Sequence, residues 1–405
     1  MATALDNMYI LISTADGKAW YVLMQQSDNP EENASCVKSY ELTGGVTQPF
    51  EHLLITLSQR RLAQMIPDEP RFIDYITPSK TQLLINSYGH SRFIVSKVRV
   101  GGKGADRTCE IEAYSHAQQY QSSTLKYNMS DRPSTIINDI LGSDYGQLDT
   151  PLKIPVPSRV LRYDVGSDFW LTTPTFSAGT NVWRVLQICA LKLGCKIWFE
   201  GEKVYVVDFR NANNTDVMGD IRIHSVGNDI SQATLGTAEI RDDGIDSVNN
   251  TQPFTYGASN TAFSYRDDAS FKYYGERVGR SLALDEITDV NDAEEIAKGL
   301  VEYRADMQRS IKFTVKELSQ HGWVRKFEPI CTAPEIRDED NNMIIDNISP
   351  SASDYNTVPP TVVRRPQYLF LSEYTRHYPE SYTDYTWGKV ANVDLPQALS
   401  SLMGK

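Results

Sequence analysis

The stretch TNVWRVLQICALKLGCKIWFEGEKVYVVDF, residues 180–209, indicates the local fold more clearly than any other part of the chain. Its first half places apolar side chains three and four residues apart, which predicts a helix over residues 180–193 with one apolar face. Thr180 is the expected N-cap, and Gly194 is expected just after the last turn. The second half has two strand-like runs around a Gly-Glu pair, which predict a β-hairpin over residues 195–209.

Most of the remaining chain is patterned like β-strands. Apolar and polar residues alternate with a period of two, and glycine-rich or proline-rich turns separate the runs. The fold class predicted from this pattern is a β-rich α+β protein. Strands are expected at residues 9–12, 19–24, 83–85, 92–95, 97–100, 107–114, 310–315, 368–371 and 378–387, with a glycine turn at residues 101–104.

Two short helices are expected between these strands. The first covers residues 54–65 and is ended by Pro67. The second covers residues 131–142, with Asp131 as its N-cap and Gly142 in the left-handed conformation after its last turn.

A longer helix is expected near the C-terminal third of the chain. It covers residues 291–308, with Asn291 as N-cap and Glu294 in the position of a capping box. The aromatic segment before it contains Tyr274-Gly275, which we interpret as a tight turn where glycine permits the backbone geometry.

Composition limits the class of protein. A chain of 405 residues is too long for one core and is expected to form several domains. Its formal charge of −12 argues against a protein that binds nucleic acid through a basic surface. The five cysteines are odd in number and widely spaced, so we predict assembly in a reducing cytosol without a disulfide framework. No signal peptide is expected, and no apolar run reaches the roughly 18 residues of a membrane span.

The sequence contains no complete motif for a nucleotide, a metal ion or a catalytic nucleophile. Cys189 and Cys195 do not have a zinc spacing, and Cys189 is expected to be a small buried apolar residue. The acidic run at residues 338–342 lacks the glycine and final carboxylate of a calcium loop, and residues 279–283 lack the last glycine of a nucleophile elbow. We therefore predict no catalytic residue, no cofactor-binding residue and no metal ligand.

Two adjacent carboxylate pairs are the remaining candidates for acid–base chemistry, namely Asp242/Asp243 and Asp267/Asp268. Both lie beside glycine or serine, which favours turns, and such pairs arise by chance in a chain with 52 acidic residues. A pair assembled from distant positions stays open, so a glycan hydrolase is kept as an alternative.

Several short segments occur in an order that is similar to that of one known family. The clearest are residues 180–209, DSVNN at 246–250 and DASFKYYGER at 268–277. They are preceded by FIV at 93–95, the turn at 101–104, the strand at 109–114 and IINDIL at 136–141. Together they resemble the baseplate or tail hub of contractile phages and related injection machines, including the late-control D type.

The resemblance implies two tail-tube-like β-barrel domains with an intervening α/β domain and a helix-bearing insertion. The expected boundaries are residues 1–100 for the first barrel and 101–210 for the intermediate α+β domain, which contains helix 180–193 and hairpin 195–209. Residues 211–405 would form the second barrel and carry helix 291–308.

The resemblance also implies a structural virion protein that is not an enzyme. It would be a homotrimeric ring that joins the sixfold tail tube to the threefold central spike or tip and lines the channel. Expected partners are the tail tube protein, the spike or tip protein, and tape-measure and baseplate proteins, with no stable nucleic-acid binding and no membrane insertion. The protein is expected in the tail baseplate of the virion, after assembly in the host cytoplasm. A carbohydrate-binding or glycan-hydrolysing tail-tip protein is the alternative.

Overall fold

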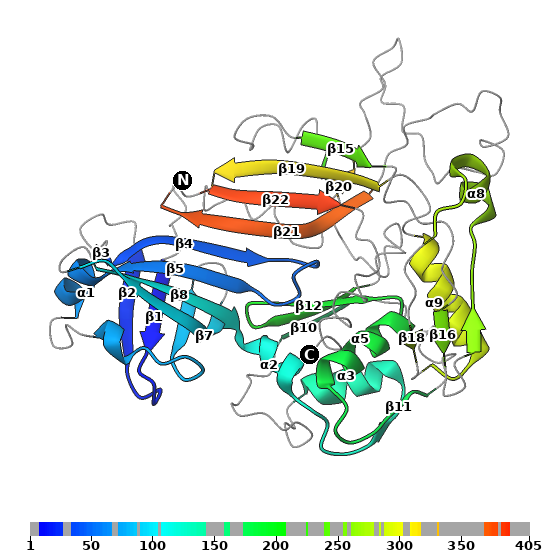
Figure 1. The fold of residues 1–405 in the computed structure, drawn as a ribbon, viewed down its shortest axis with the longest axis horizontal. Helices are drawn as coiled ribbons and strands as arrows, with labels where there is room; N and C mark the ends of the chain where they lie inside the picture. Colours follow the sequence, from blue (N-terminus) through cyan, green and yellow to red (C-terminus); the bar gives the residue numbers. More distant parts are fainter. Residues whose placement is uncertain are drawn as a thin grey trace, which may run out of the picture.

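One large sheet, drawn from both ends of the chain, organises the computed structural model of the protein (Figure 1). The residues described are 8–26, 34–66, 72–86, 90–103, 107–142, 158–162, 173–207, 224–225, 239–243, 254–256, 261–278, 283–284, 287–302, 308–316, 330–331, 368–379 and 382–388.

The sheet curls into a half-barrel and accounts for the β-rich class predicted from sequence. Its strands are β1 (Met8–Ser13), β2 (Trp20–Gln26), β3 (Ala34–Ser35), β4 (Val37–Gly44), β5 (His52–Ser58), β6 (Gln82–Asn86), β7 (His90–Gly101), β8 (Thr108–Ser115), β15 (Glu239–Asp243), β19 (Gln308–Lys316), β21 (Tyr368–Tyr378) and β22 (Tyr382–Gly388). They lie in the order β15-β19-β22-β21-β4-β5-β8-β7-β6-β1-β2-β3.

The pairing of β4 with β21 joins the first and last parts of the chain. It is antiparallel and runs from Tyr374 opposite Gly44 to Tyr378 opposite Tyr40. Strands from the two regions expected to form separate barrels therefore share one sheet in the described residues. The domain boundaries at residues 1–100, 101–210 and 211–405 stay predictions.

The expected helix over residues 54–65 is wrong in its first half. Residues 52–58 form strand β5, in which Leu53, Ile55 and Leu57 are fully buried on one face. This period of two fits a strand between β4 and β8, and pairing on both sides overrides the helical interpretation. Only Gln59–Met65 is helical, as α1, and this helix ends before Pro67 as expected.

The buried face of the sheet encloses its own apolar core. The predicted face of β8, made of Cys109, Ile111 and Ala113, is fully buried. Helix α1 and the short helix η2 (Phe72–Tyr75) contribute Leu62, Phe72 and Ile73 to the same cluster. The sheet is therefore one-sided, with an apolar interior and a polar exterior.

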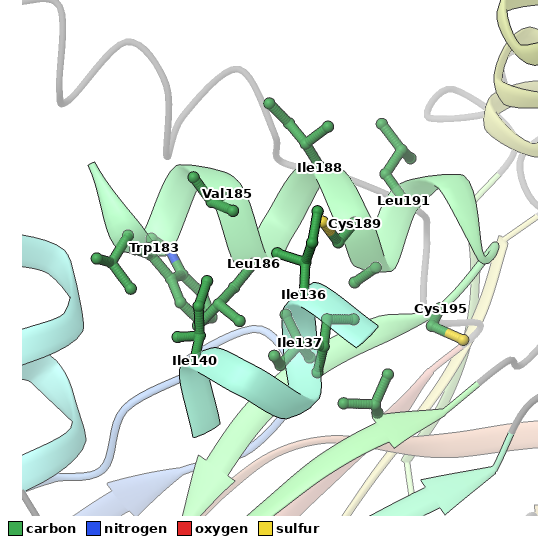
Figure 2. Packing of buried hydrophobic residues seen from close by; sticks show 14 of the residues in the cluster. Ile136, Ile137, Ile140, Trp183, Val185, Leu186, Ile188, Cys189, Leu191 and Cys195 are labelled. Carbon is green, nitrogen blue, oxygen red and sulfur yellow. The ribbon is translucent and has the colours of Figure 1, made fainter. Parts of the chain in front are cut away.

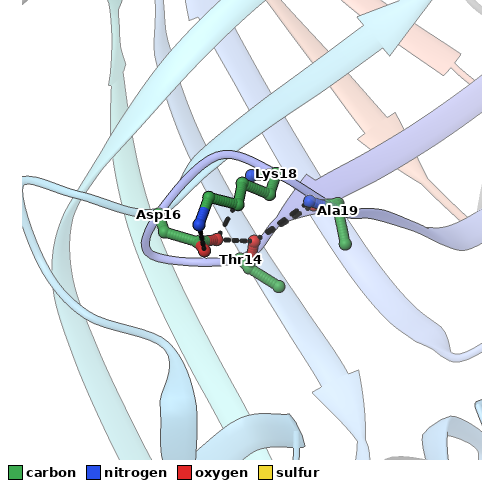
Figure 3. A network of polar contacts seen from close by, with 4 residues as sticks. All are labelled: Thr14, Asp16, Lys18 and Ala19. Atoms are coloured by element: carbon green, nitrogen blue, oxygen red, sulfur yellow. Dashed lines mark hydrogen bonds and ion pairs between the residues drawn. The ribbon is translucent and has the colours of Figure 1, made fainter.

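A tight turn joins β1 to β2 (Figure 3). Thr14 Oγ1 donates to Asp16 Oδ1 at 2.5 Å, and the Lys18 N–H donates to the same oxygen at 3.2 Å. The Ala19 N–H donates to Thr14 Oγ1 at 3.2 Å, and Gly17 takes a φ of +69°. The hydrogen bond from Thr14 holds the pKa of Asp16 below its ordinary value. The turn sets the register of the hairpin through its side chains.

A helical layer packs beside the sheet (Figure 1). Its helices are α3 (Pro133–Leu141) and α5 (Val182–Lys192), and its hairpin consists of β12 (Lys196–Glu200) and β13 (Lys203–Val207). Figure 2 shows Ile136, Ile137 and Ile140 of α3 directed toward Leu186 and Cys189 of α5. The helix-then-hairpin prediction is confirmed. Smaller elements around this layer are η4 (His116–Gln118), α2 (Gln119–Ser122), β9 (Met129–Ser130), β10 (Ser158–Arg162) and β11 (Thr175–Phe176).

The caps of these two helices differ from the predicted ones. Asn181, not Thr180, caps α5, because its Oδ1 accepts the Arg184 N–H at 3.0 Å. Gly194 follows α5 with a φ of +68°, as predicted. Helix α3 has no side-chain N-cap, since the Asp131 carboxylate accepts the neighbouring Arg132 N–H instead. Gly142 has a φ of −78°, so the predicted left-handed cap is wrong there.

The predicted C-terminal helix is shorter than expected. Helix α9 covers Val290–Glu302, residues 303–307 lie outside the described residues, and Gln308 already belongs to β19. Asp289, not Asn291, supports its start, because Asp289 Oδ1 accepts the Asn291 N–H at 2.8 Å. The segment before it forms helix α8 (Asp268–Tyr274), so the predicted turn at Tyr274-Gly275 is instead the end of a helix. Gly275 follows with a φ of +74°, which is the backbone geometry for which glycine was expected.

The remaining described strands are short. Strands β16 (Phe254–Tyr256), β17 (Thr261–Phe263) and β18 (Ala283–Leu284) form a separate sheet, and β14 (His224–Ser225) joins the large sheet through β20 (Ile330–Cys331).

A buried ion pair fixes α9 to α5. Lys192 Nζ lies 2.6 Å from Asp292 Oδ2, and the two side chains are 1% and 5% exposed. Lys192 is in the last turn of α5 and Asp292 in the first turn of α9. Each charge therefore also interacts favourably with the dipole of its own helix. Apolar residues of α9, including Ala293, Ile296 and Ala297, complete the contact.

We expect Lys192→Met to lower the free energy of unfolding by about 3–5 kcal/mol, because it leaves the Asp292 carboxylate buried without its cation. Urea denaturation followed by circular dichroism measures the loss. The double variant Lys192→Met/Asp292→Leu removes both charges and should recover most of that stability. An equal loss in the single and double variants would contradict the role assigned to the pair.

Candidate functional site

The carboxylate pairs considered for acid–base chemistry have structural roles in the part of the chain that the structure describes. Asp267 caps α8, since its Oδ1 accepts the Ser270 N–H at 2.8 Å, and Asp268 pairs with Arg266 at 2.7 Å. Asp242 and Asp243 lie in strand β15, so the predicted turn is wrong there, because pairing with β19 outweighs the local preference. Residues 338–342 and 279–282 lie outside the described residues.

The cysteines are also structural. Cys189 is fully buried on α5, as predicted, and Cys195 is buried in the same apolar cluster. Cys36, Cys109, Cys189 and Cys195 form no disulfide bond. Burial raises the pKa of Cys36 and of Cys109 to about 12, so both are thiols at neutral pH.

The described part of the chain contains neither a metal-ligand cluster nor a membrane-spanning helix. Among the residues with described positions, no three His, Cys, Asp or Glu side chains are placed to hold a metal ion. No helix within the described ranges has the length and apolar character needed to span a membrane.

The candidate functional surface is the exposed face of the large sheet, which we call the polar face. It crosses both parts of the chain through the β4–β21 pairing. Strand register defines two neighbouring rows of side chains on it. One row contains Tyr114, His52, Thr43, Thr375, Asp384 and Thr314, and the other contains Glu112, Leu54, Glu41, His377 and Tyr382.

Each part of the chain supplies a similar cluster to this polar face. In the first, the His52 ring packs on Tyr114 with centroids 4.6 Å apart, and His52 Nε2 lies 3.6 Å from Glu112 Oε1. In the second, the His377 ring packs on Tyr382 with centroids 4.5 Å apart, and His377 Nε2 lies 3.1 Å from Asp384 Oδ2. Both clusters combine an imidazole, a phenol and a carboxylate across antiparallel strands.

Hydrogen bonds hold two carboxylates of the polar face in place. Hydrogen bonds from Lys97 and Tyr114 hold the pKa of Glu112 below its ordinary value, and the Lys97 Nζ–Glu112 Oε2 distance is 3.1 Å. Partial burial and the same carboxylate raise the pKa of Tyr114. Thr314 Oγ1 donates to Asp384 Oδ1 at 2.5 Å. The surface is thus ordered by cross-strand bonds rather than by apolar packing.

A buried carboxylate anchors the polar face to the helical layer. Glu51 is 2% exposed and lies directly before β5. Its Oε1 accepts the Tyr374 hydroxyl at 2.6 Å, and its Oε2 accepts the N–H of Gly201, in the β12–β13 turn, at 2.7 Å. The carbonyl of Glu51 also accepts the Ser115 N–H at 2.9 Å. The Glu51 side chain therefore connects β21 and the β12–β13 hairpin to the start of β5.

Burial accounts for the protonation of the phenols at this junction. It raises the pKa of Tyr374 well above its ordinary value, and the Glu51 carboxylate adds to the effect. Burial and the same carboxylate raise the pKa of Tyr205 to about 12. Both phenols are neutral at physiological pH, so Tyr374 is available as a donor to Glu51.

Close backbone contact requires glycine beside the junction. A Cβ on Gly44 would lie 2.7 Å from the Tyr374 hydroxyl oxygen. A Cβ on Gly45, which has a φ of +133°, would lie 2.5 Å from the carbonyl oxygen of Ser372. The same carbonyl accepts hydrogen bonds from the N–H and the hydroxyl of Thr47, each at 3.0 Å. No residue with a side chain fits at either glycine without displacing β21.

A buried histidine lies in the same region. His116 follows β8, and neither ring nitrogen has a hydrogen-bond partner among the described residues. Burial lowers its pKa to about 4, and the charge of Arg92 contributes. Arg92 in turn lies 3.3 Å from Glu202, in the turn that also contacts Glu51.

Tyr374→Phe should lower the free energy of unfolding by about 1–3 kcal/mol, because it leaves an oxygen of the buried Glu51 carboxylate without its donor. Chemical denaturation monitored by tryptophan fluorescence gives the value. Tyr75→Phe, at an exposed site, is the matched control and should change stability by less than about 0.5 kcal/mol. Similar small changes in both variants would argue against the junction.

His116 predicts a defined pH dependence. Its pKa is about 4 in the folded protein and 6.5 ordinarily, so the unfolded chain binds the extra proton between these values. Stability should therefore fall as pH drops below 6.5 and stop falling from this source near pH 4. Between pH 7 and pH 5, the free energy of unfolding of the wild type should fall by about 2 kcal/mol more than that of the His116→Gln variant. Urea denaturation of the wild type and the variant at pH 7 and pH 5 measures this difference. Equal losses of stability in the two proteins would contradict a lowered pKa of His116.

Comparison with known proteins identifies the fold. No family model and no curated protein matches the chain. A solved prophage tail protein, gp18 from Listeria monocytogenes EGD-e, is similar with a TM-score of 0.55 at 9% identity, over 98% of this chain and 100% of that one. The 43 kDa tail protein of prophage MuSo2 from Shewanella oneidensis gives 0.54 at 10% identity, over 94% and 97%.

A tail protein from Neisseria meningitidis MC58 gives a TM-score of 0.50 at 10% identity, over 94% of this chain and 96% of that one. At such identities the likeness concerns the fold and not the sequence. The fold of this chain, over nearly its whole length, is that of phage tail proteins.

Proposed function

We propose that this protein is a structural component of a phage tail or a related injection machine, and specifically its baseplate hub. The observation that carries the proposal is the extent of the fold similarity, which covers 98% of this chain and all of a prophage tail protein. The segment order that resembles the hub family adds independent support from sequence.

In this proposal three copies form a closed ring that joins the sixfold tail tube to the threefold spike or tip. A ring closed by rotation uses two different surfaces of each copy, which meet head to tail. Two barrel-like units in each chain would present six similar contacts to the tube while the ring keeps threefold symmetry. Tape-measure and baseplate proteins would contact the same ring.

We further propose that the polar face lines the channel of the ring. Its width across strands of both parts of the chain suits a continuous wall, and its carboxylates include Glu41, Glu112 and Asp384. Fixed anions on a channel wall repel the phosphates of DNA that passes through. The role is passive and requires order in the wall rather than reactive groups.

The oligomeric state tests the proposed function. Light scattering of the purified protein should give a mass three times that of the 45.7 kDa chain, and electron micrographs should average to a threefold ring with a central channel. A monomer that binds or cleaves a glycan would overturn the proposal and favour the carbohydrate-active alternative.

A further inference from the structure

One end of the large sheet gathers positive charge in a protein that is acidic as a whole. Strands β4, β5, β8 and β7 are consecutive and antiparallel, so the start of β4, the end of β5, the start of β8 and the end of β7 lie together. The register confirms this, with Val37 opposite Leu57, and with Thr108 opposite both Ser58 and Gly101. Helix α1 continues from β5 at this end, and the Gln59 N–H donates to the Arg107 carbonyl at 3.0 Å.

Six cationic side chains occupy this end of the sheet, compared with two carboxylates among the residues described there, Asp74 and Glu110. One of the cations, Arg107, pairs with Asp74 at 2.8 Å. The two arginines of α1 are fully on the exposed side of their helix. We call this surface the basic end, and its cations are Lys38, Arg60, Arg61, Arg99, Lys103 and Arg107.

The basic end also exposes apolar area. Tyr75, which follows Asp74, is 59% exposed, and Val100, which follows Arg99, is 44% exposed. Arginine and tyrosine are enriched where proteins contact one another, and charged side chains usually surround a smaller apolar centre. The mixture of cations with exposed apolar side chains is therefore typical of a protein–protein contact.

We propose that the basic end is one side of the contact between subunits and is covered by the acidic surface of a second copy of this chain. The chain carries a net charge of −12 although this end is positive, so the rest of each copy is more acidic than the total indicates. A head-to-tail contact places the basic end of one copy against a different, acidic surface of the next. This inference rests on the ring of the proposed function and names the surface that closes it.

A second copy explains the surface better than nucleic acid does. A polyanion would be attracted by the six cations but repelled by the net negative charge of the whole chain. Its phosphate backbone would also leave the apolar side chains of Tyr75 and Val100 uncovered. An acidic protein surface satisfies both the charge and the apolar groups.

The test reverses charge at α1 with the double variant Arg60→Glu/Arg61→Glu. Both positions are exposed and lie in the first turn of the helix, where glutamate is favourable, so the fold should persist. The control is Lys18→Glu/Lys126→Glu, which makes the same change in charge at exposed positions outside the basic end. Light scattering across a dilution series measures assembly, and circular dichroism melting verifies folding.

We expect the wild type and the control to be trimeric, and the α1 variant to dissociate at a concentration at least about tenfold higher while melting at the same temperature. Dissociation of the wild type should also increase with salt, since exposed charges are screened. A trimer with unchanged dissociation in the α1 variant would overturn the basic-end contact and leave the ring intact. A monomeric wild type would overturn the ring itself. Binding of the wild type to duplex DNA that the α1 variant loses would assign the surface to nucleic acid instead.

Discussion

The hydrogen-bonded carboxylate of Glu51 is the constraint on which the arrangement of this protein depends. A buried polar side chain is tolerated only where hydrogen-bond partners surround it, and here the donors are a phenol of β21 and a backbone N–H of the β12–β13 turn. The two bonds therefore fix the position of three chain segments that lie far apart in sequence, and glycines at positions 44 and 45 allow the close approach that the bonds require.

This anchoring has a consequence for the surface on the other side of the sheet. Because Tyr374 is held on the buried face, its neighbour Thr375 and then His377 are presented on the polar face in register with β4. The similar imidazole–phenol–carboxylate clusters from the two parts of the chain are then aligned on one wall. In the proposed channel lining, this fixed surface would act through its ion pairs and hydrogen bonds.

Local features were predictable from sequence, whereas the junctions were not. The period of three and four residues identified α5, and the alternation at Cys109, Ile111 and Ala113 identified β8, because both patterns reflect burial along a single element. Residues 54–65 were misassigned because Leu57, Leu62 and Met65 fit a helix until the pairing of β5 is known. Glu51 carries no signal at all: one acid among 52 acquires its role from Tyr374, more than 300 positions away. The cross-strand clusters depend on the same long-range register.

The β4–β21 pairing also sets the order in which the chain can fold. Contacts between distant residues form slowly, because the long intervening loop must first be closed against its entropy. Strands β1 to β8 can pair with one another as soon as they leave the ribosome, but the free edge of β4 must wait until the last strands have been synthesised. During that interval β4 exposes unpaired backbone groups, which attract other strands. A chaperone that covers this nascent edge would therefore favour efficient production of the protein.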